Sequence, residues 1–354
     1  MKRSLRTRAF PLSLLLGTLA VAAILVVGAV DRPADAQDAE FVVKFATAAP
    51  EGTPWTDQLY KIKARIEEES GGRIKFKLFP GSTLGGEVET IRKCLKGKEV
   101  NGWGGSTAAV AEGVNIPALQ VFELPFMFES EPEVDFVMDS MFDSMAAKLE
   151  AKNLKMAFWH VNGWHNFATK SPIDSAQGLA GMKLRSQESP VHLAMFRALG
   201  AQPQTIPVPE VLSALQTGMV DGFSNTPLFT AATGWYEGGI TDYTITHHIY
   251  QPAVILYSKE LYDSMPADLQ TILLGDRAGD TAEGRTNVRA LTPALLEMFD
   301  DNSITVTEMP ADQRAAMVQM CASVPDDLVA EGVIDAATVK AVRSAVAAYR
   351  KRTN

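Results

Sequence analysis

The fold class of this chain can be inferred from residues 40–80, which read EFVVKFATAAPEGTPWTDQLYKIKARIEEESGGRIKFKLFP. Residues 40–46 are apolar and rich in β-forming side chains, which predicts a strand. Residues 55–70 place Leu and Ile at three- and four-residue spacing, which predicts a helix that ends at a Gly-Gly pair. Residues 73–79 alternate charged and apolar side chains, which predicts a half-buried strand. The order strand, helix, strand predicts an α/β fold with a largely parallel sheet, whose ligands bind at the carboxyl ends of the strands.

The rest of the chain continues in the same way, without an internal repeat or a low-complexity tract. Further strands are predicted over 155–161, 183–185, 219–222 and 243–256. Further helices are predicted over 87–96, 189–199, 208–218, 266–300, 311–322 and 336–350. The pair Asn162-Gly163 predicts a turn after the strand that precedes it.

The first 36 residues have the order of a secretory signal peptide. Basic residues open the chain, residues 10–30 carry no charge, and Ala34-Asp35-Ala36 offers small side chains where a signal peptidase cuts. We therefore expect cleavage after Ala36. The alternative is an uncleaved anchor, since an apolar run of this length could cross a bilayer about 30 Å thick. No second such run follows, which predicts a soluble mature chain.

Composition limits the class of partner. Without residues 1–36 the chain has 318 residues, enough for about two domains. It would then carry 12 more acidic than basic side chains, which argues against a nucleic-acid partner. An acidic protein that binds an anion needs locally placed cations, so individual arginines matter. Cys94 and Cys321 are either a disulfide or two buried free thiols, and we favour the thiols.

Signatures of an enzyme are absent from the sequence. None of the five histidines forms a helical metal pair, and neither a nucleophile elbow nor a phosphate loop occurs. Neither cysteine lies in a local catalytic signature. The sequence therefore predicts a protein without catalytic activity, without a cofactor and without a metal.

Two residues are candidates for holding a small anion. Arg185 stands at a predicted strand end, and its planar guanidinium can bind a carboxylate through two hydrogen bonds. The alternative is an ion pair with a neighbouring acid. Asn225 follows Asp221-Gly222 in a predicted loop, where its amide could donate to a ligand oxygen or simply form a turn.

Several segments occur together in an order and spacing that carry a family resemblance. They are Gly81–Glu87 (GSTLGGE), Glu123–Phe126 (ELPF), Gly181–Arg185 (GMKLR), Leu199–Ala201 (LGA), Glu210–Gly218 (EVLSALQTG), Val220–Gly222 (VDG) and Asn225. Over about residues 40–325 the chain resembles the solute-binding proteins of tripartite ATP-independent periplasmic (TRAP) transporters, of the DctP type.

The resemblance implies a two-lobed periplasmic binding protein fold, with hinge strands and a long helix that spans the lobes. Each lobe would hold a mixed, mainly parallel sheet flanked by helices. Lobe I would comprise residues 40–162 and about 250–285, and lobe II residues 163–249 and about 286–354. It also implies that Arg185 grips the carboxylate of an organic acid and that Asn225 supports it.

One departure from the family bears on the ligand. His165 stands where many sugar-acid and dicarboxylate binders carry a second arginine, and histidine offers fewer donors. We expect His165 to line the site as a neutral donor; the alternative is an ordinary loop residue. The candidate pocket loops also carry aromatic side chains, which belong either to the site or to the core: Trp55, Trp103, Trp164 and Phe223.

These features favour a monocarboxylate with an apolar or aromatic body, with a dicarboxylate or sugar acid as the alternative. The resemblance further implies a periplasmic location, a monomeric state, closure of the lobes on the ligand, and delivery to the small and large membrane subunits of the transporter. A periplasmic enzyme or a ligand sensor on the same scaffold is the alternative from another class.

Overall fold

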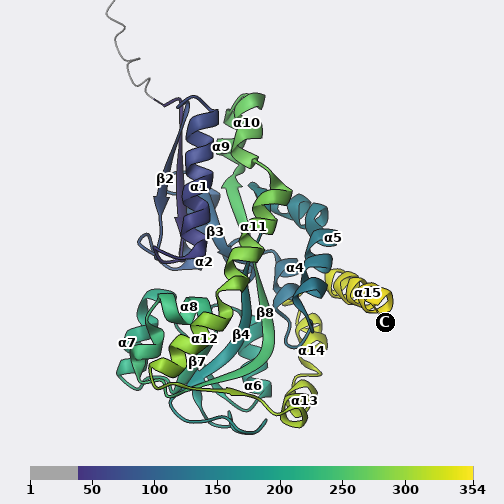
Figure 1. Ribbon diagram of the computed structural model, residues 1–354. Helices are drawn as coiled ribbons and strands as arrows, with labels where there is room; N and C mark the ends of the chain where they lie inside the picture. Colours follow the sequence, from purple (N-terminus) through teal and green to yellow (C-terminus); the bar gives the residue numbers. More distant parts are fainter. Residues whose placement is uncertain (1–38, 354) are drawn as a thin grey trace, which may run out of the picture. The chain divides into compact units, whose positions relative to one another are not determined.

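The computed structural model describes residues 39–353, which belong to one compact unit (Figure 1). The predicted signal peptide, residues 1–36, lies outside the described residues. Within the described part, no helix is both long enough and apolar enough to span a membrane.

The strands form one continuous sheet in the order β2-β1-β3-β8-β4-β7-β5-β6, with β9 paired to β8. Their bounds are β1 Phe41–Thr47, β2 Ile74–Phe79, β3 Gly102–Ser106, β4 Leu154–Thr169, β5 Lys183–Ser186, β6 Gln202–Thr205, β7 Gly222–Asn225, β8 Asp242–Ser258 and β9 Thr305–Glu308.

Helices flank this sheet (Figure 1). The α-helices are α1 Pro54–Glu69, α2 Glu87–Lys96, α3 Thr107–Val114, α4 Pro117–Gln120, α5 Glu131–Glu150, α6 Pro190–Ala198, α7 Val211–Gln216, α8 Pro227–Ala232, α9 Lys259–Ser264, α10 Ala267–Leu274, α11 Arg277–Ala290, α12 Thr292–Asp301, α13 Ala311–Met320, α14 Val324–Ala330 and α15 Ala336–Thr353. Short 3₁₀ turns are η1 Val121–Glu123, η2 Val208–Glu210 and η3 Trp235–Gly238.

The sheet has two parallel sections joined by two long antiparallel strands. At one end β1 pairs parallel with β2 and β3, and at the other end β5 pairs parallel with β6 and β7. Between them β4 and β8 run antiparallel along most of their length. The predicted α/β class with mainly parallel strands and connecting strands is therefore confirmed.

The predicted turn at Asn162-Gly163 is wrong, because β4 continues through it to Thr169. Val161 pairs with Pro252 and Gly163 pairs with Gln251, so Asn162 is one extra residue in the ladder. This is a β-bulge, and Gly163 accommodates it at φ +110°. Because both sides of the bulge stay paired to β8, the chain does not reverse.

The helical pattern over 266–300 is interrupted twice rather than continuous. Gly275 ends α10 in the left-handed region at φ +62°, and Asp276 caps the start of α11. Pro293 lacks the N–H that a continuous helix would need, so α12 begins as a new helix at Thr292. The middle helix, α11, packs against β4 (Figure 1).

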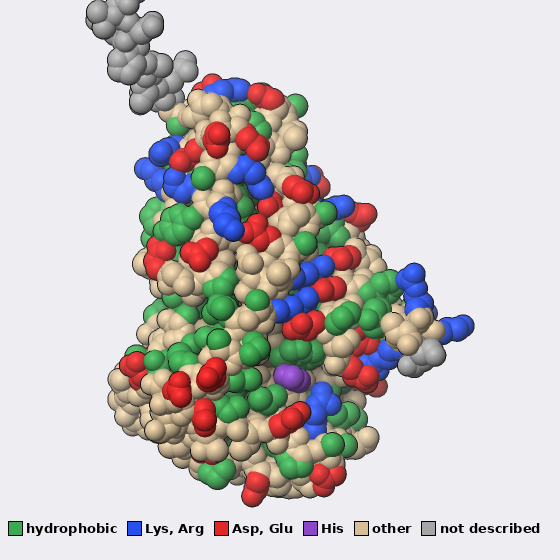
Figure 2. All heavy atoms as spheres, in the orientation of Figure 1, with side chains coloured by type: hydrophobic (Ala, Val, Ile, Leu, Met, Phe, Trp, Pro, Cys, Tyr) green, Lys and Arg blue, Asp and Glu red, His purple; other side chains and the backbone are tan. Residues whose placement is uncertain are grey.

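The surface in Figure 2 mixes acidic and basic side chains. Arg285 and Arg289 of α11 pair with Asp135 and Asp139 of α5 at N–O distances of 2.7–2.9 Å. The opposite charges of such pairs largely cancel one another's electric field at the surface.

The two cysteines are free and buried, in line with the preferred expectation. Burial raises the pKa of the Cys94 and Cys321 thiols, that of Cys321 to about 12. Both side chains are therefore inert parts of the core at neutral pH.

Candidate functional site

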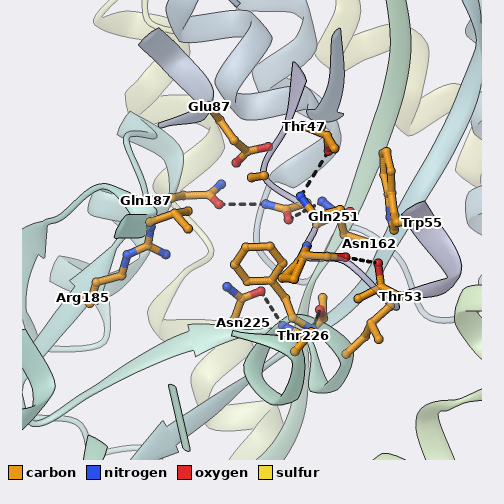
Figure 3. Close-up of a pocket in the computed structure, with 18 residues that line it drawn as sticks. Thr47, Thr53, Trp55, Glu87, Asn162, Arg185, Gln187, Asn225, Thr226 and Gln251 are labelled. Carbon is orange, nitrogen blue, oxygen red and sulfur yellow. Dashed lines mark hydrogen bonds between the residues drawn. The ribbon is translucent and has the colours of Figure 1, made fainter. Parts of the chain in front are cut away.

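A cavity lies where β1, β5 and β7 end, next to β4 and β8 (Figure 3). Its empty space, including the part open to solvent, is about 600 Å³. Ligand sites of α/β sheets lie at the carboxyl ends of strands, as the sequence predicted. The residues that line this cavity are Thr47–Pro50, Thr53, Trp55, Glu87, Gly105, Asn162, Arg185, Gln187, Val208, Asn225, Thr226, Leu228, Phe229, Ala232 and Gln251.

Arg185 is the one cationic side chain among these lining residues. It is 3% exposed, its Nε donates to the carbonyl of Ile206 at 2.8 Å, and its guanidinium lies 4.9 Å from the centre of the Trp235 ring. Its two terminal nitrogens have no hydrogen-bond partner among residues 39–353, so they are free to bind a ligand. Burial lowers the pKa of Arg185 to about 10, which leaves the side chain charged at neutral pH.

Glu87, the first residue of α2, faces the same cavity. Its Oε1 accepts from the backbone N–H of Ser106 at 2.9 Å, and its Oε2 lies 3.2 Å from the Ser106 hydroxyl. A Cβ at Gly105 would lie 2.3 Å from Oε1, so a glycine there leaves room for the carboxylate. Burial raises the pKa of Glu87, while Ser106 and the charge of Arg185 partly offset that effect.

Asn225, the last residue of β7, is 6% exposed and lines the cavity. Its Oδ1 accepts from the backbone N–H of Thr226 at 2.7 Å, and Tyr243 donates its hydroxyl proton to the Asn225 carbonyl at 3.1 Å. These bonds orient the side chain so that its amide nitrogen has no partner within the described residues. The amide is thus placed to donate to a ligand oxygen.

Trp55 also lines the cavity. Its Nε1 donates to the carbonyl of Val161 at 3.0 Å, and its ring lies 3.7 Å from the ring of His160. The indole is therefore a fixed wall between α1 and β4.

The other four candidate residues do not line this cavity. Trp103, in β3, is fully buried and donates its Nε1 to the Thr90 hydroxyl at 3.0 Å, and Phe223 packs against Trp235. Trp164 lines a different cavity, beside His247 and α12.

His165 is buried in a cluster of imidazoles, its ring centre 5.4 Å from that of His192 and 6.3 Å from that of His248. Its Nδ1 is 3.0 Å from the Ser224 hydroxyl, which also contacts His248 at 2.8 Å. Burial, together with the charge of His192, lowers the pKa of His165 to about 3, so the ring is neutral at pH 7. The sequence predicts that His165 lines the site or is an ordinary loop residue; it lies instead in β4, outside the lining of this cavity.

Sequence reasoning missed much of the polar lining: Thr53, Glu87, Asn162, Gln187 and Gln251. Single amides and hydroxyls have no distinctive spacing, so the resemblance around Gly81–Glu87 was the only available signal. Within the described residues, no group of three His, Cys, Asp or Glu is arranged to hold a metal ion.

A cavity at the carboxyl ends of two parallel sections, with one buried arginine facing into it, is the arrangement of a small-solute binding protein. Residues 45–331 match bacterial extracellular solute-binding protein, family 7 (DctP). The chain belongs to this family of TRAP solute-binding proteins.

Relatives and solved structures agree with this assignment. The chain is 29% identical over 341 residues to the C4-dicarboxylate-binding periplasmic protein DctP of Rhodobacter capsulatus, covering 95% of this chain and 98% of that one. It resembles the sugar acid binding protein of Advenella mimigardefordensis in complex with galactonate, with TM-score 0.81 and 26% identity over 86% and 97% of the two chains. A TRAP solute-binding protein of Citrobacter koseri with bound D-glucuronate has TM-score 0.78 and 28% identity, over 86% and 98%.

Proposed function

We propose that this protein captures a sugar acid, a polyhydroxy monocarboxylate, and delivers it to the membrane subunits of a TRAP transporter. The observation that carries the proposal is the pairing, in one cavity, of a single buried arginine with many hydrogen-bonding oxygens. Family members work with such membrane subunits, and relatives bind sugar acids or dicarboxylates.

The carboxylate of the ligand is held by Arg185. Its two free terminal nitrogens offer the parallel donor pair that binds a carboxylate most strongly. Trp235 beneath the guanidinium and the Ile206 carbonyl at Nε keep the fork in one orientation before the ligand arrives. The Asn225 amide supplies a further donor beside it.

The body of the ligand carries hydroxyl groups. Glu87, Gln187, Gln251, Asn162 and Thr53 line the remaining cavity, and carboxylate and amide oxygens accept hydrogen bonds from hydroxyls. Our preference for an apolar or aromatic body is not supported, because three of the aromatics behind it, Trp103, Trp164 and Phe223, lie outside the lining. The sugar-acid or dicarboxylate alternative fits better.

A C4-dicarboxylate is the second candidate, favoured by the full-length relative from Rhodobacter capsulatus. The lining disfavours it here. A second carboxylate would find no second cation among the lining residues and would share the cavity with the Glu87 carboxyl group, and like charges close together disfavour each other.

Ligand capture would proceed by closure of two lobes. We propose that the section around β1–β3 and the section around β5–β7 move toward one another, with β4 and β8 as hinge strands. Lining residues come from both sections, Glu87 from one and Arg185 from the other, so a bound ligand favours the closed state. We further propose that the protein acts as a monomer in the periplasm and returns its ligand unchanged.

The test is a calorimetric titration of the purified protein, refolded from denaturant to remove carried-over ligand. The panel contains galactonate, glucuronate, succinate and phenylacetate, each measured with wild type and with Arg185→Ala. We expect the two sugar acids to bind. Loss of Arg185 should weaken them by about 3 kcal/mol, or about 100-fold, since it leaves a buried carboxylate unpaired.

Binding of succinate in preference to both sugar acids would replace this proposal with the dicarboxylate candidate. Binding of phenylacetate alone would indicate that the ligand is a monocarboxylate with an apolar or aromatic body. Mass spectrometry of the released ligand checks that it leaves unchanged; a new product would indicate an enzyme.

A further inference from the structure

A second carboxylate, that of Glu123 in η1, lies just behind the cavity without lining it. Its side chain is 0% exposed. Oε1 accepts from the Thr107 hydroxyl at 2.8 Å and from the backbone N–H of Ala108 at 2.7 Å. These two donors belong to α3, on the β1–β3 side of the sheet.

The other oxygen of Glu123 accepts from three side chains. Gln187 donates through Nε2 at 2.9 Å, His192 through its ring Nε2 at 2.8 Å, and Gln251 through Nε2 at 3.0 Å. Two of these partners, Gln187 and Gln251, line the ligand cavity.

The charge state of Glu123 follows from these bonds. Burial by itself raises the pKa of the carboxyl group, but the hydrogen bond and charge of His192, with the bond from Gln251, more than compensate and lower it. Glu123 is therefore ionised at neutral pH. An ionised carboxylate has acceptors only, so every group that contacts it must donate.

This requirement sets the direction of the amides at the cavity wall. Gln251 Nε2 donates both of its hydrogens within the protein, one to Glu123 Oε2 and one to Gln187 Oε1 at 2.9 Å. Figure 3 shows the second of these bonds. The Gln251 Oε1 accepts from Asn162 Nδ2 at 2.8 Å. Gln187 turns its Nε2 toward Glu123. Its Oε1 therefore lies on the opposite side of the amide group, where it accepts from Gln251 Nε2.

The second N–H of Gln187 gains no good acceptor. It faces His192 Nε2 at 3.1 Å, but that nitrogen already carries the proton that it donates to Glu123. Reversing the Gln187 amide would place an oxygen against the Glu123 carboxylate, which is repulsive. One orientation is thus strongly preferred.

We propose that Glu123 is a positioning residue for specificity, which locks the amides of Gln187 and Gln251 so that the cavity wall accepts rather than donates hydrogen bonds. The inference rests on the proposed function and refines it. The wall then selects ligand groups that donate, namely hydroxyls, and rejects a second carboxylate at the same place.

The experiment compares Glu123→Gln with wild type. A glutamine has the same shape but also donates, so the neighbouring amides can reverse and present N–H groups to the cavity. The probes are galactonate and galactarate, which differ only in that the terminal hydroxymethyl group of the first is a carboxylate in the second. Both dissociation constants are measured by calorimetry.

We expect wild type to prefer galactonate and Glu123→Gln to reduce the ratio of the two affinities at least tenfold. The matched control is Glu133→Gln, which removes another buried carboxylate, 1% exposed and paired with Arg350 at 2.6 Å, away from the cavity. This control should lose stability and keep the wild-type ratio.

A ratio unchanged in folded Glu123→Gln would overturn the role of Glu123 and leave the proposed function intact. A wild type that binds neither probe, or prefers galactarate, would overturn the proposed function itself, and this inference with it.

Should Glu123→Gln fail to fold, side-chain ¹⁵N labelling of wild-type glutamines gives an independent test. The NH₂ groups of Gln187 and Gln251 should exchange slowly with solvent, with and without galactonate, because they donate to Glu123. Exchange at the rate of a free amide would contradict the proposal.

Discussion

Arg185 and Glu87 line the same cavity and influence each other's pKa through their charges, yet within the described residues no salt bridge joins the guanidinium to the carboxyl group. Arg185 is held by Ile206 and Trp235, and Glu87 by Ser106. Each charge is thus anchored on its own side, and the space between them is open to a ligand. A carboxylate at one end and a hydroxyl at the other would satisfy both.

Arg185→Lys should weaken binding of galactonate by at least about tenfold, or ~1.4 kcal/mol. A lysine keeps the charge but loses the planar fork and the stacking on Trp235. Calorimetry measures the change, and Arg197→Lys, exposed on α6, serves as the control with unchanged affinity. Equal affinity of Arg185→Lys and wild type would mean that charge alone, without the fork, holds the ligand.

Glu87→Gln should stabilise the unliganded protein at pH 7. Burial raises the pKa of this carboxyl above its ordinary value of 4.5, so the folded state favours its neutral form. The contribution of neutral Glu87 to folding stability is fully present below pH 4.5 and is lost as pH rises through the raised pKa. A glutamine stays neutral at every pH. Glu87→Gln should therefore be more stable than wild type above the raised pKa, and equally stable near pH 4.

Thermal unfolding from pH 4 to pH 8 measures this difference, with exposed Glu89→Gln on the same helix as control. A gain of stability in Glu87→Gln that persists at pH 4 would contradict the burial argument.

Gly284→Ala should destabilise the protein by about 1–3 kcal/mol, as overpacking does. Its new Cβ would lie 2.7 Å from His160 Nε2 and 3.0 Å from Gln58 Oε1, where α11 crosses β4 and α1. Replacing a glycine by alanine in an exposed helix would instead stabilise the protein by about 1 kcal/mol. Denaturant unfolding distinguishes the two, with exposed Thr286→Ala as a neutral control.

Asn166→Ala should weaken the pairing of β4 with β8. The Asn166 Oδ1 accepts from the backbone N–H groups of Thr246 and His247, each at 3.0 Å, and His247 is held at φ +46°. Losing this acceptor leaves the buried N–H of Thr246 unpaired, at a cost of about 1–3 kcal/mol, while the N–H of the exposed His247 can turn to water. Asn166→Asp keeps the acceptor and should lose clearly less, as measured by urea unfolding. Equal losses would show that the acceptor is not what stabilises the chain at Thr246 and His247.

Local periodicity predicted the regular elements well where one face is buried and the other exposed. Strand 40–46 and helix 55–70 match β1 and α1 to within one residue at each end. The same reasoning failed at Asn162-Gly163, since a bulge inside a long ladder has the local composition of a turn.

The family resemblance located Arg185 and Asn225, and both lie in the cavity lining. It had no bearing on Trp103 and Phe223, which were chosen as aromatics in candidate loops. Both lie instead in strands, β3 and β7, with their side chains packed into the core. Strand alternation turns successive side chains to opposite faces, and the register that selects the face is set by the partner strand.

From the sequence alone follow the α/β class, the family and the arginine that lines the cavity, because these depend on local patterns and ordered motifs. The tertiary structure alone brings Glu123 to Gln251 across 128 positions and to His192 across 69. Such contacts arise from the packing of the whole sheet and its helices, which no local pattern encodes. The hydrogen-bond polarity of the cavity wall, and with it the choice among acids, depends on that packing.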